Sequence, residues 1–261
     1  MTRVESITPY GNDGDVRRKS EQVREMFDSI APSYDIMNRM MTFGIDRLWR
    51  NRCVRMVSDL QPNDVLDLAA GTGDLTIAIA KKIPTASVTG ADLSEGMIEV
   101  GRKKIESASL QQRVALQVAD ALNLPFADNS FDAITIAFGV RNFQNLKRGY
   151  AEMLRVLRPG GTVVVLELTP PAAKTVKPFY RFYTRCIIPV VGRMVSKDKR
   201  AYTYLPESIA AVPARQNMTE IMELVGFTEA AWKSLTLGVA TIYSAKKPIA
   251  MHNAQCTIHN A

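Results

Sequence analysis

Histidine is nearly absent from this chain of 261 residues. There are only two, His252 and His259, and both lie in the tail 248–261, which shows no periodicity and which we expect to be disordered. The rest of the chain therefore offers no histidine for a Ser-His-Asp triad or for a metal site built on imidazole. Proton transfer in an enzyme of this composition must use carboxylates, tyrosine, water or anions stabilised by arginine.

Cysteine is scarce as well, since Cys53, Cys186 and Cys256 are the only three and lie far apart. This spacing indicates neither disulfides nor a zinc site, and a reducing cytoplasm is the expected compartment. No apolar stretch approaches the roughly 20 residues of a membrane span. The net charge is +7, but no basic run is long enough for a nucleic-acid-binding arm. We therefore predict neither a metal nor a nucleic-acid partner.

An ordinary hydrophobic content of 46% predicts one globular domain. We expect a flexible N-terminus over 1–19, a single domain over 20–247 and the tail over 248–261. Helical patterns over 20–30 and 46–60 predict an N-terminal helical cover within 20–60, and Pro32 is expected to end the first helix.

Strand and helix patterns alternate along the centre of the chain. Strands are predicted near 64–69, 86–91, 113–119, 131–138, 162–168, 227–235 and 239–245. Helices are predicted near 74–82, 94–107, 145–157 and 214–225, and Arg158-Pro159-Gly160-Gly161 is expected to be a stop before the fifth strand. This order predicts an α/β fold of the doubly wound, Rossmann-like type: a mostly parallel seven-stranded sheet with a C-terminal antiparallel hairpin.

A glycine-rich turn follows the first of these strands. Asp67-Leu68-Ala69-Ala70-Gly71-Thr72-Gly73-Asp74 ends an apolar run, and a helical pattern begins at once. Strand, glycine turn and helix form the layout of a nucleotide-type cofactor site, where glycine lets the backbone approach a ligand. The turn is flanked by two carboxylates, Asp67 and Asp74, which would repel the negative charge of a pyrophosphate. A ligand that carries an ammonium and a sulfonium would be attracted instead. The turn therefore favours S-adenosylmethionine over NAD, with candidate contacts at Asp67, Gly71 and Gly73.

Two further carboxylates follow the next two strands. Asp92 lies about 20 residues past the glycine turn, where an acid can hold both hydroxyls of a ribose. At Asp120-Ala121 a carboxylate can accept a hydrogen bond from an adenine amino group while a backbone N–H donates to the ring. The alternative interpretation is that each acid only caps a helix.

The insertion over 170–213 combines basic residues with an apolar stripe at helical spacing. A basic amphipathic helix can lie on an anionic bilayer, which would give peripheral membrane contact through 174–200. The alternative is a lid helix that packs its stripe on the sheet. Binding of nucleic acid is disfavoured because the aromatic residues lie on the apolar face.

Two narrow motifs identify a family. They are Tyr34-Asp35-Ile36-Met37-Asn38 and Phe138-Gly139-Val140-Arg141-Asn142-Phe143, and the broader glycine turn and Pro159-Gly160-Gly161 accompany them. Together they resemble the ubiquinone/menaquinone biosynthesis C-methyltransferases, a branch of the class I S-adenosylmethionine-dependent methyltransferases. The resemblance spans nearly everything from Ser20 to Lys247.

The resemblance implies methyl transfer to a ring carbon of a polyprenylated hydroquinone. It implies cofactor contacts at Thr72, Asp92, Asp120 and Ala121. In a quinol, ionisation of a hydroxyl makes the ortho carbon nucleophilic, and the implied catalytic residues would act on this ring. Arg141 would stabilise the aryloxide, Asn142 would orient the other oxygen, and Tyr34 would bind the quinol or exclude water. The alternatives are a surface ion pair between Arg141 and a helix acid, and a half-buried core position for Tyr34; no general base is identified.

Three other functions compete with this hypothesis. A dinucleotide-dependent oxidoreductase would need a glycine where Thr76 stands, and a second nucleotide-binding half for which the C-terminal hairpin leaves no room. A methyltransferase for another small molecule or a lipid, and a non-enzymatic partner with a relic cofactor fold, are the others. Demethylmenaquinol is favoured as substrate on overall similarity to menaquinone-pathway members, and a benzoquinol is the alternative. The oligomeric state is left open.

Overall fold

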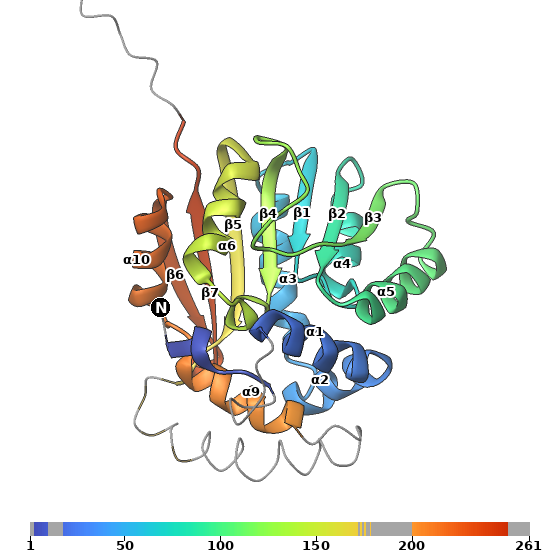
Figure 1. Cartoon of the computed structure of the whole chain (residues 1–261). Coiled ribbons are helices and arrows are strands. Elements are labelled where there is room, and N and C mark those ends of the chain that lie inside the picture. Colours follow the sequence, from blue (N-terminus) through green and yellow to red (C-terminus); the bar gives the residue numbers. More distant parts are fainter. Residues whose placement is uncertain are drawn as a thin grey trace, which may run out of the picture.

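A seven-stranded sheet forms the centre of the protein, as the computed structural model in Figure 1 shows. The structure describes residues 3–9, 18–171, 173, 175, 178 and 200–249. The strands are β1 (Asp64–Leu68), β2 (Ser87–Asp92), β3 (Val114–Val118), β4 (Phe131–Ala137), β5 (Leu157–Leu168), β6 (Thr228–Leu235) and β7 (Ala240–Lys246). Their order is β3-β2-β1-β4-β5-β7-β6; neighbours among β1 to β5 are parallel, and β7 runs antiparallel to β5 and to β6. The predicted doubly wound sheet with a C-terminal antiparallel hairpin is confirmed.

Helices cover both faces of this sheet. Those described are α1 (Lys19–Ile30), α2 (Tyr34–Thr42), α3 (Asp46–Ser58), α4 (Asp74–Lys82), α5 (Glu95–Ser107), α6 (Leu146–Val156), α9 (Arg200–Ala211) and α10 (Gln216–Val225). Short 3-10 turns are η1 (Arg3–Ser6), η2 (Ala31–Ser33), η3 (Val140–Asn142) and η5 (Thr236–Gly238). Helices α3, α4 and α5 share one buried cluster with the sheet, and α6 and α10 share the other. Two apolar layers thus sandwich the strands, as an α/β fold requires.

A third apolar cluster lies beneath the helical cover formed by α1 and α2. Val23, Met26, Ile30 and Met37 of the cover pack there with Met97 of α5. This cover sits at the carboxyl ends of the parallel strands (Figure 1), the edge where ligands bind in open α/β sheets.

The first helix of the cover ends where the sequence predicted. Helix α1 runs to Ile30, Pro32 lies in the short 3-10 turn η2, and α2 begins directly at Tyr34. A proline is tolerated in the first turn of a helix because its missing N–H has no partner there in any case. The chain therefore turns a corner at Pro32 and stays helical.

The fifth strand begins earlier than predicted. Leu157 already pairs with Phe131, and the register then shifts by a bulge before Ala133 pairs with Thr162. Gly160, with φ of 80°, adopts the left-handed conformation inside this irregular start. The Pro-Gly-Gly motif therefore lies inside the strand and not before it. A bulge accommodates extra, unpaired residues that a regular ladder would exclude, and it bends the strand. Helix α9, which contains Pro206, lies within the segment that we treated as an insertion.

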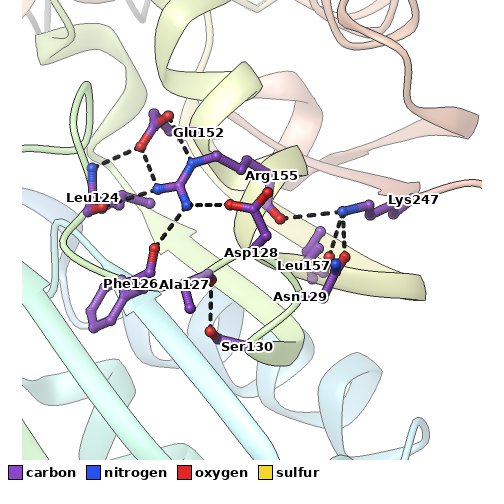
Figure 2. A network of polar contacts seen from close by, with 10 residues as sticks. All are labelled: Leu124, Phe126, Ala127, Asp128, Asn129, Ser130, Glu152, Arg155, Leu157 and Lys247. Atoms are coloured by element: carbon purple, nitrogen blue, oxygen red, sulfur yellow. Dashed lines mark hydrogen bonds and ion pairs between the residues drawn. The ribbon is translucent and has the colours of Figure 1, made fainter.

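The loop between β3 and β4 is pinned to α6 by Arg155 (Figure 2). Its guanidinium donates to the carbonyls of Leu124 and Phe126 and forms ion pairs with Asp128 and Glu152. Glu152 in turn accepts the Leu124 N–H at 2.8 Å. Because this loop begins at Asp120-Ala121, the network fixes the loop that carries two candidate site residues.

The N-terminal turn η1 contacts the start of α6. The Glu5 carboxylate in η1 accepts the Leu146 N–H, the first of α6, at 2.7 Å. Residues 3–6 are therefore packed, within the stretch for which we predicted a flexible N-terminus. Most of the tail 248–261 and of 174–200 lies outside the described residues. Among the helices that are described, none is long and apolar enough to cross a membrane.

Candidate active site

A cavity that is open to solvent lies between the sheet edge and α1. It brings together six of the predicted site residues: Tyr34, Gly71, Asp92, Asp120, Ala121 and Asn142. Gly71 comes from the turn after β1, Asp92 from the end of β2 and Asp120 from the loop after β3. Parallel strands end at one edge of the sheet, so positions far apart in sequence converge there.

Asp92 is held rigidly at the floor of this cavity. One of its carboxylate oxygens accepts the Gly71 N–H at 2.8 Å, and the other accepts the Ser94 N–H at 2.9 Å. Burial raises its pKa, and these backbone N–H groups oppose the rise because they stabilise the ionised form. A carboxylate oxygen has two lone pairs, so each can still accept a hydroxyl of a bound ligand.

Asp120 holds the opposite side of the cavity through an Asx turn. Its side chain accepts the Leu122 N–H at 2.9 Å, and it forms an isolated bridge with Asn123. The described charged groups that line the cavity are Asp92, Asp120 and the guanidinium of Arg24. With two acids and one cation, the lining disfavours a negatively charged pyrophosphate. It fits S-adenosylmethionine better, which has hydroxyls, an amino group and positive charge.

Asp67 lies beneath this cavity and not in its wall. It is 1% exposed, and its two oxygens accept hydrogen bonds from the hydroxyls of Thr76 (2.6 Å) and Thr135 (2.7 Å). Burial raises its pKa to about 6, against the opposing effect of the two hydroxyls. In the structure Asp67 joins β1, β4 and α4 under the glycine turn. A cofactor contact by Asp67 stays a prediction.

Thr72 and Gly73 likewise face the protein. The Thr72 hydroxyl donates to Asp35 of α2 at 2.6 Å, and Lys104 of α5 contacts both Thr72 and Asp35. Gly73, with φ of 79°, is the left-handed residue before α4. Thr72 therefore anchors the glycine turn to the cover, Gly73 starts α4, and neither lines the cavity. A direct cofactor contact by Thr72 stays a prediction.

A second, smaller cavity adjoins the first and is mostly apolar. Phe27 and Tyr34 line both cavities, so the two cavities adjoin at these rings. Their rings meet edge to face with centroids 6.0 Å apart. Methionines, isoleucine and leucine from α1, α2 and α9 line most of the rest, together with three polar side chains, Asn38, Arg141 and Tyr204.

Arg141 lies in this second cavity and forms a buried ion pair. Its Nη1 donates to the Glu167 carboxylate of β5 at 2.7 Å and also to the Phe138 carbonyl. The Arg141 backbone N–H donates to the other Glu167 oxygen at 3.2 Å. Within the described residues, its Nε is buried without a hydrogen-bond partner. The alternative of a surface pair with a helix acid is wrong, because the partner is a buried strand acid.

Asn142, the next residue of η3, faces the first cavity. Its side-chain oxygen accepts the Tyr204 hydroxyl of α9 at 3.0 Å. From beneath, the Lys19 ammonium donates to the Arg141 carbonyl at 3.1 Å, and burial lowers the pKa of Lys19 to about 8. The 3-10 turn thus presents Arg141 to one cavity and Asn142 to the other.

Three carboxylates that organise this site were missed by the sequence analysis. Asp28 accepts the Ser94 hydroxyl at 2.6 Å and the Gly96 N–H at 3.0 Å, which fastens α1 to the start of α5. Asp35 fastens α2 to the glycine turn, and Glu167 holds Arg141. Asp35 stands inside the Tyr34–Asn38 motif that carries the family resemblance, and Glu167 is the only acid in the apolar run 162–168. A lone carboxylate in a buried strand requires a partner, which was the available signal.

Comparison with known proteins places the chain in a family. The model of the ubiE/COQ5 methyltransferase family matches residues 15–247. The chain belongs to this family. It is 49% identical over 248 residues to the demethylmenaquinone methyltransferase of Porphyromonas gingivalis, covering 95% of this chain and 100% of that one. It is 44% identical over 230 residues to the ubiquinone/menaquinone biosynthesis C-methyltransferase UbiE of Geotalea daltonii, covering 88% of this chain and 97% of that one.

Solved structures support the fold. The [4+2]-cyclase SpnF superimposes with a TM-score of 0.67 at 19% identity, covering 88% of this chain and 97% of that one. A crystal structure described as an O-methyltransferase from Nostoc punctiforme gives 0.61 at 18% identity, covering 85% of this chain and 60% of that one. Because a cyclase shares the fold, the fold by itself does not define the reaction. Family membership identifies this protein as a methyltransferase.

Proposed function

We propose that the protein transfers a methyl group from S-adenosylmethionine to a ring carbon of a polyprenylated hydroquinone, with demethylmenaquinol as the substrate. The relatives at 43–49% identity named demethylmenaquinone methyltransferase support this choice of quinol. The alternative substrate is a benzoquinol, in keeping with the relatives named UbiE.

The observation that carries the proposal is that the two cavities adjoin. Tyr34 lines both, so a ligand in the first cavity and a ring in the second would lie next to each other there. The first cavity holds the carboxylates suited to the methyl donor, and the second is apolar with a guanidinium at one end. An aromatic diol with a hydrocarbon tail matches this second combination.

In the first cavity, Asp92 is proposed to bind the ribose hydroxyls, and Asp120 with the Ala121 N–H to bind the adenine. When bound, S-adenosylmethionine supplies a methyl group on a positively charged sulfur, which a ring carbon accepts as the carbon–sulfur bond breaks. The N–H groups of Gly71 and Ser94 hold the Asp92 carboxylate in place before any ligand binds. Such preorganisation lowers the entropy that is lost on binding.

In the second cavity, Arg141 is proposed to stabilise the ionised quinol hydroxyl. The orphaned Nε–H is a donor without a partner among the described residues, and an aryloxide oxygen would satisfy it. Negative charge on that oxygen makes the ortho carbon nucleophilic, and the ring later loses its proton to water. Asn142 faces the first cavity but bonds Tyr204 of the second, and it would orient the second oxygen where the two cavities adjoin. Tyr34, which lines both cavities, would exclude water there. No described side chain is assigned as general base.

Membrane contact through 174–200 was also predicted, but nearly all of that segment lies outside the described residues. A polyprenyl substrate would be held in a bilayer, so we propose that the enzyme works from the cytoplasmic side as a peripheral protein.

The decisive experiment offers labelled S-adenosylmethionine with reduced demethylmenaquinone, with its benzoquinol counterpart, and with each oxidised quinone. We expect label in the naphthoquinol product and none in the oxidised samples, which have no hydroxyl to ionise. Preferential labelling of the benzoquinol would reverse the choice of ring. Labelling of neither quinol would refute the proposed function.

A further inference from the structure

Tyr204 of α9 connects the two cavities. It lines the second cavity with Arg141, and its hydroxyl donates at 3.0 Å to the side-chain oxygen of Asn142, which lines the first. Helix α9 lies at the same end of the sheet as the cover formed by α1 and α2 (Figure 1), and Tyr204 is 3% exposed there. A buried hydroxyl between two adjoining cavities is placed to influence what they bind.

Packing alone does not account for this hydroxyl. The Tyr204 ring packs with Met26, Met37 and Met97 in the apolar cluster beneath the cover. A phenylalanine ring would fill the same space without burying a polar group, which costs free energy unless the group finds a partner. The partner that the hydroxyl finds is a candidate site residue, Asn142. The hydroxyl is therefore the part of Tyr204 that bears on function.

The charge of Arg141 favours the direction of this hydrogen bond. Burial raises the pKa of Tyr204, and the positive charge of Arg141 opposes this rise, so the guanidinium acts on the hydroxyl. Hydroxyl dipoles orient in the field of nearby charges, and a cation attracts their oxygen end. The proton is then turned away from Arg141, and Asn142 Oδ1 accepts it. Because the net shift is upward, the hydroxyl stays protonated at neutral pH and acts as a donor.

The Tyr204 hydroxyl thereby decides which atom of the Asn142 amide is left for a ligand. A side-chain amide has one oxygen, which accepts, and one nitrogen with two N–H donors. With the oxygen bound to Tyr204, the nitrogen remains, and no hydrogen bond from Asn142 Nδ2 is found in the described part of the chain. The Arg141 Nε–H likewise has no partner among the described residues. The turn η3 thus offers a ligand N–H donors from both of its polar side chains.

We propose that Tyr204 is a positioning residue that fixes Asn142 as a hydrogen-bond donor toward the second oxygen of the quinol. The inference rests on the proposed function, which supplies the ring and its two oxygens. It adds a rule of specificity: the oxygen beside Asn142 must accept a hydrogen bond and need not donate one. A hydroxyl and a methoxy group both meet this rule. A reversed amide would present its own oxygen and would therefore favour a hydroxyl.

The test compares two methyl acceptors that differ at this oxygen. One is reduced demethylmenaquinone, a diol. The other is its monomethyl ether, in which the hydroxyl beside the methyl-accepting carbon is free and the hydroxyl beside the prenylated carbon is methylated. We expect the native enzyme to methylate both.

The variant Tyr204→Phe keeps the ring and frees the Asn142 amide to reverse. The ratio of kcat/KM for the diol to kcat/KM for the ether should then rise about tenfold, because two acceptors face each other only when the ether is bound. The bulk of the added methyl group affects the native enzyme and the variant alike, so the change in the ratio reports the amide. A merely structural role for Tyr204 would lower both values together.

Two controls separate positioning from packing. Tyr150→Phe removes another buried hydroxyl, which donates to Met218 Sδ at 3.2 Å in the cluster that α6 and α10 share with the sheet. Tyr150 lines neither of the two cavities, so the ratio should keep its native value. Asn142→Ala should lower the rate with both acceptors. Tyr204→Phe added to Asn142→Ala should not change the ratio further, because a residue that acts through Asn142 has no effect once the amide is gone.

Three results would overturn the inference. The first is an equal fall in kcat/KM for both acceptors in Tyr204→Phe. The second is a raised ratio that Tyr204→Phe still produces in the Asn142→Ala background. The third is a native enzyme that methylates the diol and rejects the ether.

A measurement without turnover separates this inference from the proposed function. The ¹⁵N NMR signal of the Asn142 side-chain amide, identified by its loss in Asn142→Ala, should shift in Tyr204→Phe and stay in place in Tyr150→Phe. If it shifts in this way but the native protein methylates no quinol, the proposed function fails and the positioning of Asn142 stands. A signal that does not respond to Tyr204→Phe overturns the positioning, whatever the substrate.

Discussion

Arg141 Nη1 lies 2.7 Å from Glu167 Oε1, and the two side chains are almost wholly buried, at 7% and 0% exposure. Glu167 also accepts the backbone N–H groups of Arg141 and Leu168. Burial alone would lower the pKa of Arg141, but Glu167 more than offsets this and the pKa is raised. The pair therefore fixes the guanidinium in its charged form at one end of the second cavity, and the partnerless Nε–H is the donor left for a ligand.

Removing one member of this pair should cost more stability than removing both. Glu167→Gln leaves a buried cation without its counter-charge, for which a loss of roughly 3–5 kcal/mol is typical. The double variant Arg141→Met/Glu167→Met should be more stable than Glu167→Gln because no charge remains buried. Urea denaturation of each single and of the double variant measures this coupling. Additive effects would show that the pair is not coupled.

Asp92→Ala should weaken binding of S-adenosylmethionine. Hydrogen bonds that involve a charged group contribute roughly 1.5–3 kcal/mol, so a loss of about tenfold or more is expected. Titration calorimetry measures it. Asp132 is a matched control, since it also accepts two backbone N–H groups, those of Asn63 and Asp64, but at the start of β4, away from the cavity. Equal affinity losses in Asp92→Ala and Asp132→Ala would show that a general structural defect, not a lost contact, is responsible.

Asp67→Asn should stabilise the fold at neutral pH. Burial raises the pKa of Asp67 from 3.8 to about 6, so the folded state binds this proton more tightly than the unfolded state. The resulting stability is fully present below pH 3.8 and is lost as the pH rises through 6; the difference corresponds to roughly 3 kcal/mol. The amide of Asp67→Asn does not ionise, so the variant does not lose stability as the pH rises. Its stability relative to the native protein should therefore rise between pH 4 and 6 and then level off.

Chemical denaturation of both proteins across that range gives the slope. Asp132 supplies a control of opposite sign, because its hydrogen bond from Arg158 and its two backbone N–H donors lower its pKa even though burial opposes them. Its stabilisation is present at higher pH and lost as the pH falls, so Asp132→Asn should lose relative stability as the pH rises from acid. A stability difference for Asp67→Asn that does not change with pH would contradict the assignment.

The sequence was sufficient for the strands and for the edge of the sheet at which a ligand binds. Period and turn residues predict β1 to β4 within two residues at each end, because buried strands leave a strong local signal. The same analysis could not find the Glu167 pair, since residues 141 and 167 meet only through the pairing of β4 with β5. It also could not find the bonds of Asp67 to Thr76 and Thr135, because an acid before a glycine turn has the same sequence pattern whether it faces a cavity or two threonines. Contacts between distant elements are decided by packing, which no local pattern contains.

The last prediction concerns the chemistry at Arg141. Arg141→Ala should lower kcat for the reduced quinol about 10²–10³-fold, which corresponds to the loss of one donor to a developing oxyanion. Affinity for S-adenosylmethionine should stay close to native, because Arg141 lines the second cavity and not the first.

Since Arg141→Ala also leaves Glu167 unpaired, the double variant Arg141→Ala/Glu167→Gln must be assayed beside it. If the lost donor is the cause, kcat of the double variant stays low although its stability recovers. Arg141→Lys should restore the positive charge but not the fixed, planar N–H donors of a guanidinium, and so recover only part of the rate. Activity of Arg141→Ala should rise at higher pH, where hydroxide ionises the quinol without help, whereas a merely structural defect would not respond in this way. Normal turnover in Arg141→Ala, or full recovery in Arg141→Ala/Glu167→Gln, would exclude the proposed role and direct attention to Tyr34 and Asn142.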